Sequence, residues 1–301
     1  MVTHSRALLG ACALALTGSV ASAQTAPAAQ PRVQAPQPTA AETAELRRVV
    51  NRGRQLFEID RAARLTTREL LTRVADPAAA GVVGWIAEPE GNGITVTYYA
   101  QGSAGPVAVF RGQVIAGRVA APDLFAAESR PALTPFQRRL VAARATVEAL
   151  GNTACGEAQF NIFAVPPATR DGPIDVYQFS AQTAAARIPA GGHFVTTVAA
   201  DGTAGTSRAL TGACRNIELP RVAQGQRPAP IRIAQEGEPL PNEAHVLMSY
   251  WAGRPIFVTA GTPERMWGIA GDEIRLVGVR RDAATPAPAP APAATRRGSG
   301  R

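Results

Sequence analysis

The sequence predicts an α+β fold: N-terminal helices, an antiparallel β-meander, a central helix and a second antiparallel strand-rich half. Two segments carry apolar residues at helical spacing behind capping residues. Between and after them, short runs of β-branched and aromatic residues are separated by Gly- and Pro-containing turns. Strand and helix patterns do not alternate regularly, as they do in parallel α/β folds.

The start of the chain has the pattern of a secretory signal peptide over residues 1–23. One arginine precedes an uncharged apolar run of roughly 15 residues, which is shorter than a spanning helix needs. Ala21-Ser22-Ala23 provides a site for cleavage after Ala23. Leu9-Gly10-Ala11-Cys12 resembles a lipoprotein box, although the sequence after Cys12 is apolar. We expect a periplasmic or secreted protein with the signal peptide removed; lipidation at Cys12 or a retained N-terminal helix is the alternative.

Two low-complexity segments flank the body of the protein. Residues 24–40 are rich in Ala, Pro and Gln, and residues 283–301 combine Ala-Pro repeats with three arginines. Such segments bury too little apolar surface to offset chain entropy, so both are predicted to be disordered. The body divides into a helix-plus-meander half, 41–150, and a strand-rich half, 151–282.

The first half begins with a capping box at residues 39–42, followed by apolar residues at helical spacing. A second capping box at residues 66–69 predicts that a separate short helix starts there. Four antiparallel strands are predicted next, at residues 82–87, 94–99, 107–110 and 113–119. Thr134-Pro135-Phe136-Gln137 then predicts the start of the central helix, residues 135–150.

The second half predicts eight short strands. They are expected at residues 158–165, 174–180, 193–199, 206–210, 245–251, 255–259, 266–269 and 273–277. Residues 215–242 contain five prolines and little periodicity, which indicates a long irregular connection.

The distribution of charge argues against a nucleic-acid-binding function. The formal net charge is +8, but residues 76–282 hold 18 Arg and 18 acidic residues. The excess of Arg lies in the first helical segment and the tail, so the body lacks the basic stripe of a nucleic-acid-binding protein.

The sequence contains no lysine, since all 31 basic residues are Arg. Without lysine, a Walker A loop, a Schiff base and a Ser-x-x-Lys nucleophile are impossible.

Two cysteines, Cys155 and Cys214, follow the signal peptide. In an oxidising compartment we expect them to pair, since exported proteins form disulfides there. A bridge that closes a loop of about 60 residues stabilises the fold by on the order of 4 kcal/mol. A free buried thiol and a reactive thiol paired with His193 are the alternatives.

The best candidates for chemistry are His193, His245 and Glu243. Each His stands at a predicted strand start, and two His with one carboxylate form the ligand set of many catalytic zinc sites. The compact spacing of a His-Glu-x-x-His motif is absent, so each His instead capping a strand or packing at the surface is the competing interpretation. No other cofactor is expected.

Other polar and aromatic residues have weaker signals. Asp60 follows an apolar helix face and is a candidate polar anchor, or else an ion pair or cap. Trp85, Trp251 and Trp267 all lie in predicted strands, where a core position is expected more often than a ligand platform. A pair of carboxylates for glycoside chemistry has no local spacing, so the sequence neither predicts nor excludes one.

Several motifs together resemble a family of exported alphaproteobacterial proteins of unknown function. The first is Gly53-Arg54-x-Leu56-Phe57-x-x-Asp60-Arg61-Ala62-Ala63. The others are Gly191-Gly192-His193-Phe194, Asp201-Gly202, Cys214, Glu243-x-His245-Val246, Pro255-Ile256-Phe257-Val258 and Met266-Trp267. The resemblance covers most of residues 45–277. It implies one architecture and brings no activity with it.

Three functions remain open at this point. The first is a non-enzymatic envelope protein that binds or scaffolds an unknown envelope component, with no nucleic-acid partner and no integral membrane segment. The second is a metal-dependent hydrolase that uses His193, His245 and Glu243. The third is a small-ligand or glycan binder that uses a Trp surface.

Overall fold

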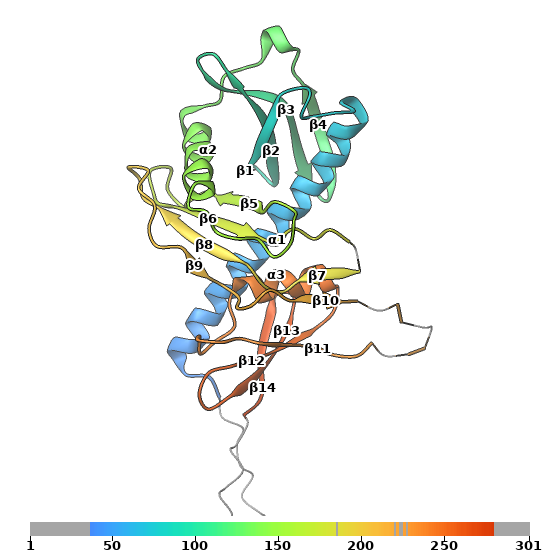
Figure 1. Ribbon diagram of the computed structural model, residues 1–301, viewed down its shortest axis with the longest axis vertical. Helices are drawn as coiled ribbons and strands as arrows, with labels where there is room; N and C mark the ends of the chain where they lie inside the picture. The colour runs from blue at the N-terminus through green and yellow to red at the C-terminus, as the bar shows by residue number, and fades with distance from the viewer. Residues whose placement is uncertain (1–36, 185, 220, 223–224, 227, 280–301) are drawn as a thin grey trace, which may run out of the picture. The chain divides into compact units, whose positions relative to one another are not determined.

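The structure, a computed structural model, describes residues 37–184, 186–219, 221–222, 225–226 and 228–279 (Figure 1). The signal peptide, Cys12 and the predicted tail lie outside the described residues, as does most of the linker. The described part belongs to one unit of the chain, residues 35–301, so the two predicted halves are parts of it. It contains three α-helices and fourteen strands, which confirms the α+β class.

The first helix, α1 (Ala40–Arg73), is one continuous helix of 34 residues. The predicted capping box at its start is confirmed: the Thr39 hydroxyl accepts from the Glu42 N–H, and the Glu42 carboxylate accepts from the Thr39 N–H. The predicted second helix start at residues 66–69 is wrong. The Thr66 hydroxyl donates to the Ala62 carbonyl oxygen one turn earlier, so it does not cap a new helix.

The buried stripe of α1 explains why the helix does not break. Its members lie three or four residues apart, which places them on one face. They are Leu46, Val49, Gly53, Leu56, Ile59, Asp60, Ala62, Ala63, Thr66 and Leu70. This face packs against strands of the meander and against the third helix.

The predicted four-stranded meander is confirmed, with the order β1-β2-β3-β4. Its antiparallel strands are β1 (Val82–Glu90), β2 (Gly93–Gly102), β3 (Gly105–Ile115) and β4 (Arg118–Leu124). The short strands predicted at residues 107–110 and 113–119 are wrong in detail. Residues 107–110 belong to β3, while 113–119 cover its end, the turn and the first residues of β4. A register shift between Arg111 and Gln113 interrupts the alternation of β3.

The central helix, α2 (Pro135–Glu148), is confirmed with its capping box. Thr134 accepts from the Gln137 N–H, and the Gln137 side chain accepts from the Thr134 N–H. A short 3-10 turn, η1 (Ala127–Ser129), precedes it. The helix packs against β1 and against strands of the second half, so it joins the two predicted halves.

The second half contains two sheets and one strand pair. The first sheet has the order β5-β6-β8-β9, and the pair is β7 with β10. Their bounds are β5 (Asn161–Val165), β6 (Ile174–Phe179), β7 (Arg187–Pro189), β8 (Phe194–Val198), β9 (Arg208–Ala209) and β10 (Asn216–Glu218). The sequence does not predict β7 and β10, because strands of three residues are too short to show alternation.

The last sheet has the order β11-β12-β13-β14. The third helix, α3 (Glu243–Ala252), lies between β11 and β12 in the sequence and connects these two strands. Its strands are β11 (Ile231–Ala234), β12 (Ile256–Ala260), β13 (Arg265–Ala270) and β14 (Glu273–Val279). Two predictions are wrong here. Residues 245–251 are helical, and the connection over 215–242 contains β10 and β11. The β11–β12 pair is parallel, whereas the other strand pairs described are antiparallel.

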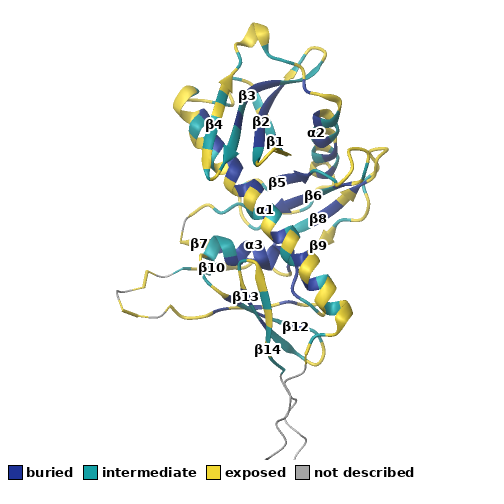
Figure 2. Ribbon diagram, turned by 180° about the vertical axis from the view of Figure 1, so that it is seen from behind, coloured by how far each residue is buried: buried dark blue, intermediate teal, exposed yellow. Residues whose placement is uncertain are grey.

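The sequence around α3 explains its helical state. The Asn242 side chain accepts from the Ala244 N–H, and His245 accepts from the Asn242 N–H, which forms a capping box with His at the third position. Gly253 ends the helix in the left-handed conformation, φ +61°. Seven of the ten residues of α3 are buried, and Figure 2 shows most of this helix in dark blue. None of the helices in the described ranges is long and apolar enough to span a membrane.

Candidate functional site

The predicted disulfide is present between Cys155 and Cys214, 59 residues apart in the chain. The Gly191-Gly192 pair lies directly against it. A Cβ on Gly192, whose φ is +66°, would come within 2.5 Å of Cys155 Sγ, and a Cβ on Gly191 within 2.3 Å of the Ala213 carbonyl oxygen. Both positions therefore require glycine, because a side chain would collide with the disulfide or with the backbone beside it.

His193 follows these glycines and is fully buried. Its Nδ1 accepts from the Ser180 N–H at 3.3 Å, so the neutral ring carries its proton on Nε2. Nε2 lies 3.1 Å from the Pro189 carbonyl oxygen, to which it donates. Both ring nitrogens are thus engaged by the backbone.

His245 is also fully buried and sits in the first turn of α3. Its Nδ1 accepts from the Asn242 N–H at 3.1 Å, while Nε2 has no hydrogen-bond partner in the described part of the chain. Burial lowers the pKa of His193 to about 4 and of His245 to about 3; the neighbouring His193 further lowers the pKa of His245. Both rings are therefore neutral at physiological pH.

Glu243 begins α3 and is 1% exposed. Its Oε1 accepts from the Tyr177 hydroxyl at 3.0 Å and lies 3.5 Å from Arg208 Nη2. Burial, and then the charge of Glu243, raise the pKa of Tyr177, so the phenol stays protonated and donates. The carboxylate joins α3 to β6 and β9 and lies at a helix N-terminus, where a negative charge is favourable.

These contacts describe a buried polar cluster rather than an open metal centre. In the described ranges, no group of three or more His, Cys, Asp or Glu side chains could hold a metal ion. His193 has no free nitrogen, since one would have to give up a backbone hydrogen bond to bind a metal. The metal-dependent hydrolase remains a hypothesis that rests on the sequence alone.

Asp60, which the sequence marked as a candidate polar anchor or else an ion pair or cap, has partners on both α1 and α3. Its Oδ2 accepts from Arg64 Nε at 2.8 Å and from Trp251 Nε1 at 2.9 Å. The carboxylate is buried, while Arg64 remains partly exposed. Asp60 thereby fixes the ring of Trp251 against α1.

A cavity of about 310 Å³ opens beside this contact, and we call it the α1–α3 cleft. Its walls come from α1, from α3 and from the segment after β6. The lining residues are Phe57, Asp60, Arg61, Arg64, Leu65, Arg68, Gln182, Tyr250 and Trp251. The cleft combines three guanidinium groups with three aromatic rings, so it offers both charge and flat apolar surface to a ligand.

The aromatic rings of the cleft are held in place by their neighbours. Phe57 and Tyr250 stack with ring centroids 4.3 Å apart and an interplanar angle of 7°. Trp251 packs edge-on against Phe179, 6.0 Å between centroids, and against His193. The three lining rings are each only partly buried, so they present apolar surface to the cleft.

The other two tryptophans do not form a platform with Trp251. Trp267 is fully buried in β13, and Trp85 is partly buried in β1 with its ring 5.6 Å from that of Phe163. Both occupy strands, as predicted, whereas Trp251 lies on α3.

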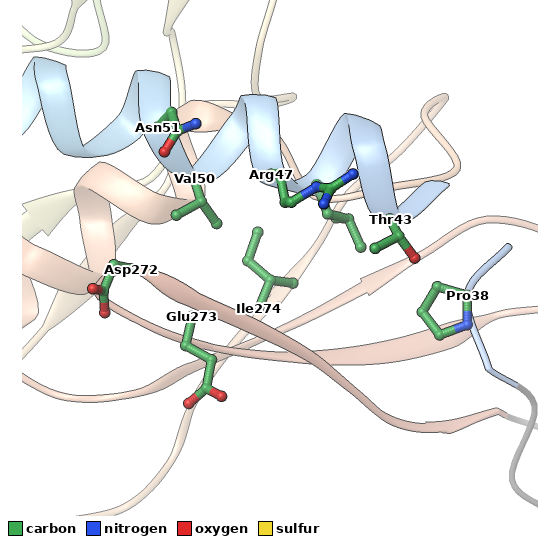
Figure 3. A pocket seen from close by; sticks show the side chains of 9 residues that line it. Pro38, Thr43, Arg47, Val50, Asn51, Asp272, Glu273 and Ile274 are labelled. Atoms are coloured by element: carbon green, nitrogen blue, oxygen red, sulfur yellow. The ribbon is translucent and has the colours of Figure 1, made fainter. Parts of the chain in front are cut away.

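A second cavity, of about 330 Å³, lies between the start of α1 and the β13–β14 turn (Figure 3). Arg47 of α1 shares it with Asp272 and Glu273, which Figure 3 shows across the cavity from the helix. This cavity carries charges of both signs, and the aliphatic residues Val50 and Ile274 line it between helix and strand. Its lining therefore favours no single class of ligand as clearly as that of the α1–α3 cleft.

The sequence does not predict the cleft. Its patterns mark Asp60 and the Arg-rich first helix, but they predict a strand at Trp251 and give no reason to bring residues 60 and 251 together. Arg61 and Arg68 lie seven residues apart, a spacing that puts them on one helix face and was the available signal. Comparisons with protein-family models, curated proteins and solved structures found no match to this chain.

Proposed function

We propose that the protein is a non-enzymatic, exported binding protein that holds a small ligand in the α1–α3 cleft. One observation carries the proposal: arginines of α1 and partly exposed aromatic rings of α1 and α3 line a single cavity of about 310 Å³. That volume lies at the lower end of the range of small-molecule sites.

The burial of the three residues first suggested for catalysis supports a binding function over a catalytic one. His193, His245 and Glu243 are each at most 1% exposed and lie within the core. A substrate would have to enter that core to reach them. The α1–α3 cleft, by contrast, is open to solvent and lined by side chains that remain partly exposed, such as Arg68 and Tyr250.

Two features support an extracytoplasmic location. The Cys155–Cys214 disulfide is typical of proteins that fold in an oxidising compartment. The signal-peptide pattern of residues 1–23 points the same way. Fractionation of cells that express the full chain tests this part, with mature protein starting at Gln24 in the periplasm or medium as the expected result.

The binding proposal is tested with a ligand panel of neutral sugars, anionic sugars and aromatic acids, monitored by saturation-transfer NMR. At least one class is expected to bind the wild-type protein. The Tyr250→Ala variant should lose that binding, because it removes a lining ring. Phe160→Ala, which removes a partly buried ring outside the cleft, is the matched control and should keep it. Binding that is equal in both variants would place the ligand elsewhere and refute the proposal.

A further inference from the structure

The α1–α3 cleft carries an excess of positive charge. Arg61, Arg64 and Arg68 line it with Asp60 as the only acidic residue among its lining side chains. Asp60 pairs with Arg64 at 2.8 Å. In the described part of the chain, neither Arg61 nor Arg68 has a carboxylate within 4.0 Å, although most other exposed arginines of α1 do. Two guanidinium charges are therefore left for a ligand.

The Arg61 side chain reaches from α1 to the turn between β3 and β4. A Cβ on Gly117, whose φ is +75°, would lie 2.3 Å from Arg61 Nη2, so the guanidinium lies over this glycine. Arg61 is exposed, and its charge is accessible to a ligand.

Arg64 is positioned from the other side of the cleft. Its Nε donates to Asp60, and its Nη2 donates to the Gln182 side-chain oxygen at 3.4 Å. Asp60 itself is fixed by the Trp251 indole. Asp60 and Arg64 are therefore fixed in the cleft before any ligand arrives.

Arg61 and Arg68 are exposed and share the cleft with partly exposed aromatic rings. The planar guanidinium also matches the two oxygens of a carboxylate or phosphate. The rings of Tyr250 and Trp251 offer flat apolar surface, and the Tyr250 hydroxyl adds a polar group for the hydroxyls of a ligand.

We infer that the ligand of the α1–α3 cleft is an anionic sugar, a single pyranose-sized ring that bears a carboxylate or a phosphate. This inference rests on the proposed function. The ring lies against the aromatic wall, and the anionic group binds Arg61 and Arg68. Carboxylate and phosphate share the same recognition chemistry here, so separate probes distinguish them.

Isothermal titration calorimetry with the full-length protein tests the inference, with galacturonate, glucose 6-phosphate, galactose and inorganic phosphate as probes. One of the two anionic sugars is expected to bind at least about tenfold more tightly than galactose, since a charge-assisted hydrogen bond is worth that factor or more. It should also bind more tightly than inorganic phosphate, which lacks the ring. Whichever anionic sugar binds identifies the charged group.

Two variants make the test specific. Arg68→Gln removes one unpaired charge of the cleft and is expected to weaken binding of the anionic sugar about tenfold. Arg47→Gln makes the same change on the same exposed helix but outside the cleft, and should leave binding unchanged. A thermal melt of both variants shows that they fold, as expected for exposed positions.

The outcomes separate the two proposals. Galactose binding as tightly as both anionic sugars, with loss in Tyr250→Ala but not in Arg68→Gln, would overturn the inference and leave the proposed function standing. Inorganic phosphate binding as tightly as the sugars would also overturn it, because the ring would contribute nothing. If none of these probes binds and the wider neutral and aromatic panel is also silent, the proposed function itself fails.

Discussion

Acidification from pH 7 to pH 5 should destabilise the folded protein through its two buried imidazoles. The pKa of His193 is lowered to about 4 and that of His245 to about 3 by burial. In the unfolded chain both titrate near about 6.5. Between these values the unfolded state binds protons that the folded state does not, so the free energy of unfolding falls as the pH falls. This contribution to stability is complete above pH 6.5.

The size of the effect follows from the number of protons. Each proton bound only by the unfolded state changes the free energy of unfolding by about 1.36 kcal/mol per pH unit. Between pH 6 and pH 5 most unfolded imidazoles are charged, so the two rings together give a slope of about 2.4 kcal/mol per unit. This is a large fraction of a typical domain stability of about 5–15 kcal/mol. Glu42, whose pKa is lowered in the folded state by hydrogen bonds from Thr39 and Arg265, changes stability mainly below the unfolded-state pKa of about 4.3, so it adds little in this window.

Urea denaturation at closely spaced pH values measures this slope, and the His245→Gln variant tests its origin. Glutamine at the third position preserves the capping box of α3 while removing one titrating ring. The slope between pH 6 and pH 5 should fall to about half in this variant. An unchanged slope, or folded-state imidazole NMR signals that titrate near pH 6.5, would refute the buried neutral pair.

Three further tests concern the α1–α3 packing, a buried hydrogen bond and the disulfide. Gly53→Ala should destabilise by about 1–3 kcal/mol despite a better helix propensity, because its Cβ would lie 2.4 Å from Val246 Cβ; a more stable variant in urea would contradict this α1–α3 approach. Asp60→Ala and Trp251→Phe should each destabilise, with a coupling of about 1 kcal/mol in the double-mutant cycle; strict additivity would mean that their hydrogen bond contributes nothing. Cys155→Ser should lower the free energy of unfolding by on the order of 4 kcal/mol, and an unchanged urea midpoint would show that the disulfide does not stabilise the fold.

Local sequence predicted those helices whose signals are complete within a few residues. Thr39 and Thr134 each begin a capping box followed by an amphipathic stripe, and both helices start where predicted. The meander was predictable for a similar reason, since alternation along β2 and its turns is local. These elements carry their own hydrogen-bonding and burial pattern, so the rest of the chain does not need to be known.

The third helix was missed because its burial removes the helical pattern. A helix that packs on several sides has no polar face, and its apolar residues then resemble a buried strand. In α3, Val246, Tyr250 and Trp251 are also residue types that favour strands. The deciding signal is the cap at Asn242, where His245 takes the place of the usual Glu or Gln.

A capping box can also mislead, as residues 66–69 show. The Thr66 hydroxyl donates within the helix and also lies 3.2 Å from the Tyr98 hydroxyl. That tyrosine comes from β2, and the position of β2 against α1 cannot be known from the residues around Thr66. The contact with Tyr98 stabilises Thr66 inside one continuous helix, although the residues around Thr66 could also have begun a new helix.

The candidate ligand site depends even more on distant residues. Arg47, Arg54, Arg61 and Arg68 follow one another at seven-residue intervals and look equivalent in the sequence. In the structure, the first shares a cavity with two acidic side chains and the second lies 4.0 Å from Glu58. The last two instead line a cleft that also contains aromatic residues from a helix almost two hundred residues later. Four like charges on one helix therefore differ in what they can bind, and the difference comes from the surface that the rest of the fold places opposite each of them.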